Sequence, residues 1–204
     1  MWQVLADELD GFTVVSVALD ADPDAAAALV RKYGPTYPVL IDVRHEVAEL
    51  YGMVNVPSAA WIDEEGRIAR PTHIAGAGEA WRDETDRETS RLSDEGRAAL
   101  LETRMAYMDA VRAWVREGAY ELREPLPDAG ESPLALAHFR LATYLHERGL
   151  DGAHHHFEEA VRLRPASWNF RRQALALERP GDAAEQFWTA VDATPPGAYY
   201  PPAL

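Results

Sequence analysis

The sequence predicts an α/β unit in the first third of the chain and an α-helical region in the last third. Residues 1–75 alternate strand and helix patterns, which is typical of a layered α/β structure. Residues 13–19 form a nearly continuous apolar run rich in valine, which indicates a strand buried on both faces. Residues 132–193 carry helical spacing instead, interrupted by glycine and proline where two helical hairpins would turn.

The elements of the first third follow from apolar spacing and from the turn residues between the apolar runs. Gly11 and Gly34 end helices, because glycine adopts the left-handed conformation of a helix stop at little cost. Pro71 marks the last strand as an edge strand, because proline lacks the N–H group that a central strand needs. In chain order the predicted elements are a helix at 1–9, a strand at 13–19, a helix at 25–33, a strand at 37–42, a helix at 45–51, a strand at 58–63 and a strand at 68–74.

Composition divides the rest of the chain. Residues 76–92 contain glycine and a run of charged side chains, and we predict an exposed, charged connector there. Helical spacing predicts one helix over 93–118, and proline and glycine mark 119–132 as a linker. Residues 133–204 are predicted to form helical hairpins with a Pro/Tyr-rich tail. That tail cannot be a regular helix, and we expect it to pack on the rest of the chain.

The charge of the chain excludes some classes of partner. The 204 residues include 34 acidic and 20 basic ones, giving a formal net charge of −14. Because this average field repels phosphate, we expect neither nucleic acid nor an anionic membrane as a partner. No apolar run reaches the ~18 residues of a membrane helix, and the opening residues lack the basic start of a secretory signal. We expect a soluble, cytoplasmic chain, although an export signal would be missing if Met1 is not the true start.

The chain contains no cysteine, and this limits its own chemistry. Disulfides, Cys-ligated metals and thiol nucleophiles are excluded within it. The consecutive residues His154, His155 and His156 point about 100° apart on a helix and cannot all converge on one ion. We therefore expect them on a solvated face with no metal site, and we expect His45 at the surface. No catalytic signature is present, so we predict no catalytic residue and no cofactor.

A series of short pieces carries a resemblance to a known family. The more specific pieces are Tyr51-Gly52, Val56-Pro57, Trp61-Ile62-Asp63 and Glu64-Glu65-Gly66-Arg67-Ile68. The weaker pieces, which precede them in order, are 5–9, 12–20, 32–33, 37–42 and 48–50. On these pieces residues 2–70 resemble the thioredoxin-like redoxins: the alkyl hydroperoxide reductase/thiol-specific antioxidant superfamily and the thiol reductases of cytochrome maturation.

The resemblance implies a thioredoxin-like α/β fold that is incomplete at its N-terminus. In that family a central strand ends in a cysteine motif and leads into the first major helix, and this chain begins inside that helix. The missing strand would lie between the strands at 13–19 and 58–63. Either Met1 is an internal methionine of a longer redoxin, which is our working hypothesis, or the sheet closes differently or borrows a strand.

The dipeptide Val56-Pro57 is the most informative piece of the resemblance. It corresponds to the cis-proline that faces the reactive thiols of redoxins, so we predict a cis bond. The resemblance implies that Val56, Pro57 and Ser58 form an edge on which a peptide or another substrate docks. The alternative is a turn proline that is kept for shape.

The C-terminal hairpins resemble tetratricopeptide repeats. The residues near that repeat's small and large positions are Leu141, Ala142, Leu145, Gly149, Ala153, Phe157, Ala160 and Pro165, and then Gly181, Ala183, Phe187 and Ala190. Two degenerate repeats would pack as one helical domain, and a plain helical bundle is the alternative. Trp168, Tyr199 and Tyr200 are a candidate partner groove in this half.

Two hypotheses about function follow. The resemblance implies a thiol–disulfide or peroxide redoxin, whose cysteines would lie outside this chain because thiol exchange needs a thiolate. The alternative is a noncatalytic scaffold that binds a protein or peptide partner through the redoxin-like edge and the helical hairpins. Self-association is also expected if the strands at 13–19 and 58–63 lack a neighbour.

Overall fold

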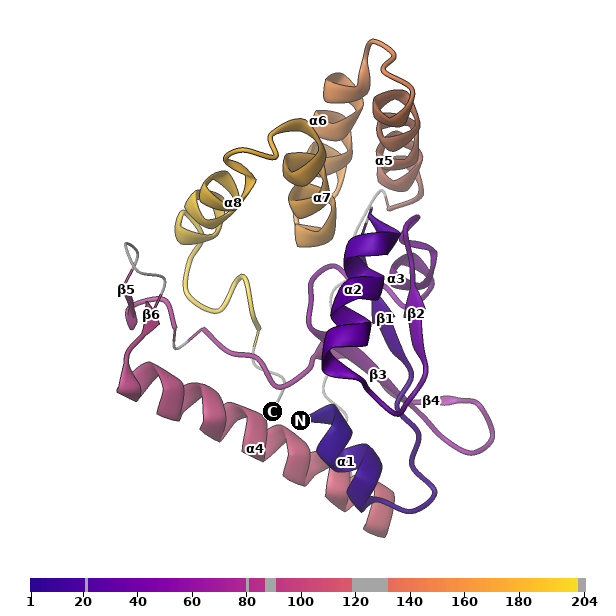
Figure 1. The fold of residues 1–204 in the computed structure, drawn as a ribbon, viewed down its shortest axis with the longest axis vertical. Coiled ribbons are helices and arrows are strands. Elements are labelled where there is room, and N and C mark those ends of the chain that lie inside the picture. The colour runs from indigo at the N-terminus through magenta and orange to yellow at the C-terminus, as the bar shows by residue number, and fades with distance from the viewer. Residues whose placement is uncertain (21, 80, 87–90, 119–131, 202–204) are drawn as a thin grey trace.

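The computed structural model describes residues 1–20, 22–79, 81–86, 91–118 and 132–201, which form a mixed α/β protein (Figure 1). The elements of the first part are α1 (Trp2–Glu8), β1 (Ser16–Ala18), α2 (Pro23–Tyr33), β2 (Val39–Ile41), α3 (Glu46–Leu50), β3 (Ser58–Ile62) and β4 (Ile68–Ile74). The elements after them are β5 (Thr85–Asp86), β6 (Arg91–Leu92), α4 (Asp94–Glu117), α5 (Ser132–Glu147), α6 (Ala153–Leu163), α7 (Trp168–Glu178) and α8 (Ala183–Asp192). The order of elements predicted over residues 1–75 is confirmed.

Capping residues set the ends of the longer helices. The Asp22 carboxylate accepts the N–H groups of Asp24 and Ala25 and begins α2, and Gly34 ends that helix in the left-handed conformation. The Ser93 hydroxyl accepts the N–H of Gly96 at the start of α4. These short-range signals lie in the sequence, which is why the helix positions could be predicted.

The strands are paired two by two in the described part of the chain. β1 pairs with β2 in parallel, and β3 pairs with β4 in antiparallel orientation. The ladder of β4 shifts register around Pro71, as expected for an edge strand. β5 pairs with β6 just before α4. β1 and β3, which we expected to flank a missing strand, do not pair with each other, so direct pairing does not close the sheet.

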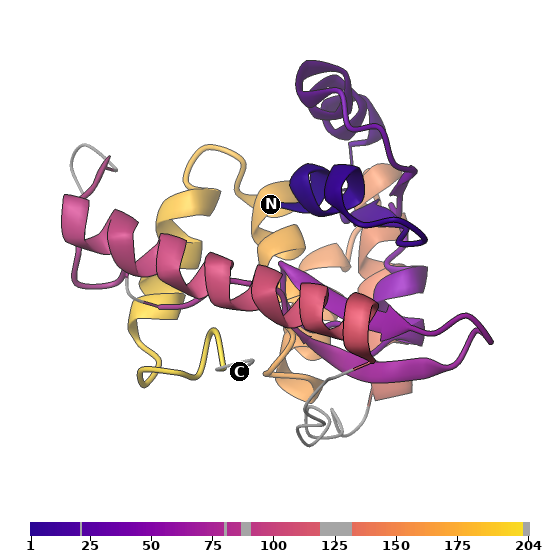
Figure 2. The ribbon, with the colours of Figure 1, turned by 90° about the horizontal axis from the view of Figure 1, so that it is seen from below.

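Helix α4 covers the apolar side of the α/β unit. Its buried residues Tyr107 and Val111 pack in one cluster with Leu5 of α1 and Trp61 of β3. Figure 2 shows α1 lying along α4, and the Glu8 carboxylate of α1 accepts hydrogen bonds from the guanidinium of Arg112 on α4. The helix that the sequence placed in a segment of its own therefore contributes to the core of residues 1–75.

A buried chain of hydrogen bonds ties α4 to β3 and β4. The indole N–H of Trp61 donates to the Tyr107 hydroxyl (3.0 Å), which lies 2.8 Å from Nε2 of His73. Nδ1 of His73 lies 2.8 Å from the Pro71 carbonyl, an acceptor, so Nδ1 carries the proton and Tyr107 donates to Nε2. Burial, together with the nearby Arg70 guanidinium, lowers the pKa of His73 to about 4, although the hydrogen bond to the Pro71 carbonyl opposes this shift. Burial raises the pKa of Tyr107 to about 12.

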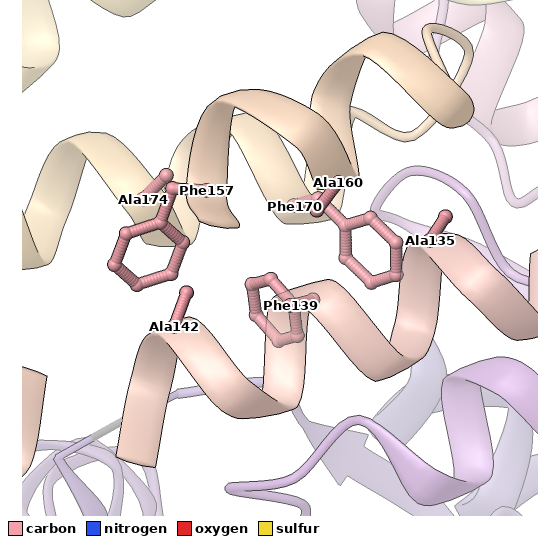
Figure 3. Packing of buried hydrophobic residues seen from close by; sticks show 7 residues of the cluster. All are labelled: Ala135, Phe139, Ala142, Phe157, Ala160, Phe170 and Ala174. Carbon is pink, nitrogen blue, oxygen red and sulfur yellow. The ribbon is translucent and has the colours of Figure 1, made fainter. Parts of the chain in front are cut away.

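The second core lies among the helices α5, α6 and α7 (Figure 3). The ring of Phe139 stacks on Phe170 with centroids 4.4 Å apart and meets Phe157 edge-on at 6.1 Å. Ala142 and Ala160 are fully buried beside them, and their small side chains allow the helices to approach closely. The predicted hairpins are confirmed, since α5 pairs with α6 and α7 with α8. None of the described helices has the length and apolar character needed to cross a membrane.

The prediction of an exposed connector at 76–92 is wrong at Glu79 and Arg82. The side chains of Glu79 and Arg82 are only 10% and 12% exposed and form an ion pair with an N–O distance of 2.8 Å. Charge alone indicated a solvated segment, whereas the C-terminal tail covers these residues, as described below. The predicted linker at 119–132 lies outside the described residues, apart from Ser132, which begins α5.

Candidate functional site

Two groups of predicted site residues, from opposite ends of the chain, meet in one place. The hydroxyl of Tyr200 donates to the carbonyl of Val56 across 2.9 Å, although the two residues are 144 positions apart. The ring of Tyr199 lies 4.9 Å from that of Trp168, edge to face. The candidate docking edge and the candidate partner groove therefore form a single site, which we call the loop–tail site.

The loop side of the loop–tail site is organised by Asn55, which is almost fully buried. Its Oδ1 accepts the N–H of Val56 (2.9 Å), and its Nδ2 donates to the carbonyl of Tyr199 (2.7 Å). The Ser58 hydroxyl donates to the Asn55 carbonyl (2.6 Å). The Val56–Pro57 bond is cis, which confirms the prediction. Both polar backbone groups of Val56 thus already have partners within the chain.

The tail side is held through its backbone by one carboxylate. Glu79 accepts the N–H groups of Gly197 (2.8 Å), Tyr199 (2.8 Å) and Tyr200 (2.7 Å). The chain turns at Gly197, which has a φ of +81°. This turn makes the three N–H groups converge as in an anion-binding nest. Arg82 extends the contact by donating to the carbonyl and hydroxyl of Thr194 (both 3.0 Å). In Figure 1 the yellow segment after α8 runs beside the segment that links β4 to β5.

An aromatic pocket encloses the side chain of Tyr199, which is only 1% exposed. Its hydroxyl accepts a hydrogen bond from Arg172 on α7 (2.8 Å), which satisfies the polar end of a buried ring. Burial also raises the pKa of the neighbouring Tyr200 phenol. The rings around Tyr199 are those of Trp81, Trp168, Phe187, Trp188 and Tyr200.

Beside the loop–tail site, α7 holds the same loop from a second direction. Asn169 donates its backbone N–H to the carbonyl of Val54 (3.1 Å) and its side-chain amide to the carbonyl of Met53 (2.7 Å). The side chains of Glu49 on α3 and Arg164 form an ion pair that is largely buried. The helical region is therefore fixed to the α/β unit through the segment that precedes β3.

His45 was expected at the surface, and that prediction is wrong. It has a φ of +56° just before α3, and its ring is buried against Phe139, with centroids 5.0 Å apart. Asp42 caps α3 in its place, accepting the N–H groups of Glu46 and Val47. Burial lowers the pKa of His45, and the Asp42 carboxylate opposes this shift.

The chemistry of the loop–tail site suits binding. Its polar groups are amides, a carboxylate, guanidinium groups and phenols, and most of them are directed at backbone N–H and carbonyl groups. The sequence did not point to Asn55, Glu79, Arg82 or Arg172, because their partners lie far away along the chain and form no local motif. No protein-family model, curated protein or solved structure matches this chain.

Proposed function

We propose that this chain is a noncatalytic protein-binding scaffold and that the loop–tail site binds a short Pro/Tyr-containing segment. In this structure the chain's own residues 194–201 occupy the site. The observation that carries the proposal is the set of three backbone N–H groups that Glu79 accepts from this segment. These hydrogen bonds involve backbone groups, so a segment from another chain that makes the same turn would form them as well.

The side-chain contacts would supply specificity. The pocket around Tyr199 has aromatic walls and one hydrogen-bond donor, Arg172, at the position of the phenol oxygen. Buried tyrosine and tryptophan side chains in such pockets contribute more to binding than the residues around them. We therefore expect the bound segment to need tyrosine at the position of Tyr199.

The chain's own tail would compete with any partner for this site. A tethered segment acts at an effective concentration that is typically in the millimolar range for short flexible links. A partner segment in solution must therefore bind much more tightly than the tail, or bind after the tail has left. On this proposal the loop–tail site is closed in the free chain.

A redoxin-type role remains the second candidate. The parallel pair β1–β2 and the antiparallel pair β3–β4, covered by α4, support it, as does the set of motifs in residues 2–70. In that role the Val56-Pro57 edge would position a substrate for cysteines supplied from outside the chain. The chain itself has no thiolate, so we expect it neither to reduce insulin disulfides nor to consume peroxide through a thiol.

The scaffold proposal is tested with a labelled peptide of the sequence of residues 194–201. The chain carrying Tyr199→Ala has a weakened tail, and we expect it to bind the peptide, as measured by fluorescence anisotropy. The unmodified chain, whose tail is in place, should bind far less. The matched control is Tyr33→Ala, because Tyr33 is 74% exposed and distant in sequence from the site.

Two further variants decide whether the site is the one described. Adding Glu79→Gln to the Tyr199→Ala chain should abolish peptide binding, since an amide cannot accept three N–H groups as a carboxylate does. A peptide with alanine in place of its first tyrosine should also fail to bind. Peptide binding that is unaffected by Glu79→Gln would contradict the proposal, as would equal binding by the unmodified chain.

A further inference from the structure

Two histidines from different helices face each other outside the loop–tail site. Nδ1 of His138 on α5 lies 2.9 Å from Nδ1 of His156 on α6, and their ring centroids are 5.0 Å apart. Both side chains are partly exposed, so an ion can reach them from solvent. The sequence had suggested only the run His154–His156, and the contribution of α5 could not be seen in it.

The separation of the two nitrogens matches a pair of adjacent ligands on one metal ion. Two imidazole nitrogens bonded at ~2.0–2.1 Å and 90° apart are separated by ~2.9 Å, whereas a tetrahedral ion would separate them by ~3.3–3.4 Å. A 90° angle is the preference of square-planar or tetragonal copper(II). In the present hydrogen bond the N–H of one ring points at the lone pair of the other. The rings must therefore turn to direct both lone pairs at an ion, and their partial exposure leaves room for this.

The charge around the pair favours a cation. The carboxylate of Glu159, one turn along α6, interacts electrostatically with His138, His155 and His156. The Glu159 carboxylate accepts a hydrogen bond from the Arg162 guanidinium (2.8 Å). It therefore adds negative potential at the pair and does not serve as a metal ligand. No group of three or more His, Cys, Asp or Glu side chains suited to a metal occurs in the described ranges. The pair would therefore supply two ligands, and water the rest.

We propose that His138 and His156 form a two-histidine site for Cu²⁺ that links α5 to α6. The bound ion would take the place of the Nδ1 proton of one ring, which would move to Nε2 of the same imidazole, and it would cross-link the α5–α6 hairpin. Because an ion that binds only the folded chain stabilises it, the site would also raise the melting temperature of the protein.

The proposal is tested by titrating the full chain with Cu²⁺ in a calorimeter. We expect His138→Ala and His156→Ala each to weaken the affinity for Cu²⁺ at least tenfold. The matched control is His154→Ala, which removes an exposed histidine of the same helix and should leave the affinity unchanged. Cu²⁺ should raise the melting temperature of the unmodified chain and of the control, but of neither of the two variants.

The electron paramagnetic resonance spectrum of the Cu²⁺-loaded, unmodified chain does not depend on the folding of any variant. We expect nitrogen coupling from two imidazoles. Coupling from one nitrogen or none would overturn the proposal, as would an affinity that falls equally in the His154→Ala control. Binding that persists when His138 and His156 are both replaced would do the same.

Discussion

Protonation of His73 should make the stability of this protein depend on pH between pH 5 and 7. The pKa of His73 is about 4 in the folded chain, against an ordinary value of 6.5. Because the folded-state pKa is the lower one, the unfolded chain binds more protons in this window. The contribution of neutral, buried His73 to the free energy of unfolding is therefore fully present above pH 6.5, and it is lost as the pH falls toward 4. Each pH unit between the two pKa values changes the free energy of unfolding by up to about 1.4 kcal/mol, so lowering the pH from 7 to 5 should cost about 2 kcal/mol.

The measurement is urea unfolding of the full chain at several pH values from 5 to 7, compared with His73→Gln. Glutamine is neutral throughout this range, so the variant should lose the His73 contribution to the slope, whatever its own stability. His45, whose pKa is also lowered, and His154, whose pKa is raised by Glu178, titrate in both proteins and cancel in the comparison. Equal slopes for the two proteins would refute the reasoning.

Three further outcomes are expected. Glu49→Ala should lower the free energy of urea unfolding by about 3–5 kcal/mol, because it leaves the Arg164 charge buried without that partner. The control Glu46→Ala removes an exposed ion pair and should lower the same free energy by less than ~1 kcal/mol. Phe139→Ala should cost about 3–5 kcal/mol in the same assay, and a loss below ~1 kcal/mol would mean that the cluster in Figure 3 is not packed as described. The fragment 1–92 should self-associate in size-exclusion chromatography with light scattering, because removal of α4 exposes the apolar side that Tyr107 and Val111 cover, next to the β1 and β3 edges that do not pair with each other. A monomer that melts cooperatively would contradict this.

The sequence predicted features that depend on neighbouring residues. Helix α2 was foreseen from its apolar spacing and from the stop at Gly34, and it begins at Pro23, two residues before the predicted start, because the Asp22 carboxylate caps it there. The strands were foreseen from short apolar runs. The strand predicted at 13–19 is shorter in the structure, where β1 spans only Ser16–Ala18, because the flanking residues lie outside the ladder with β2. For the loop–tail site, the sequence predicted Val56 and the tail tyrosines Tyr199 and Tyr200 as parts of two different sites.

What the sequence missed depends on contacts between distant residues. Glu79 lies in a run of charged residues, and only the turn at Gly197 shows why its carboxylate is buried. His45 precedes a helix and resembled a surface residue, because nothing nearby indicates the Phe139 ring that covers it. The convergence of Val56 and Tyr200 could not be predicted for the same reason, since it requires the helical region to be docked first.

The distance in sequence between the two sides of the loop–tail site sets an order of events during synthesis. Asn55 is made 144 residues before Tyr199, whose carbonyl its side chain binds. At a synthesis rate of about 5–20 residues per second, the amide of Asn55 and the carbonyl of Val56 wait roughly 7–30 s for their partners. During that interval on the ribosome the loop is open to any segment that can make the same hydrogen bonds. A partner present at translation would therefore meet the loop before the chain's own tail exists to compete for it.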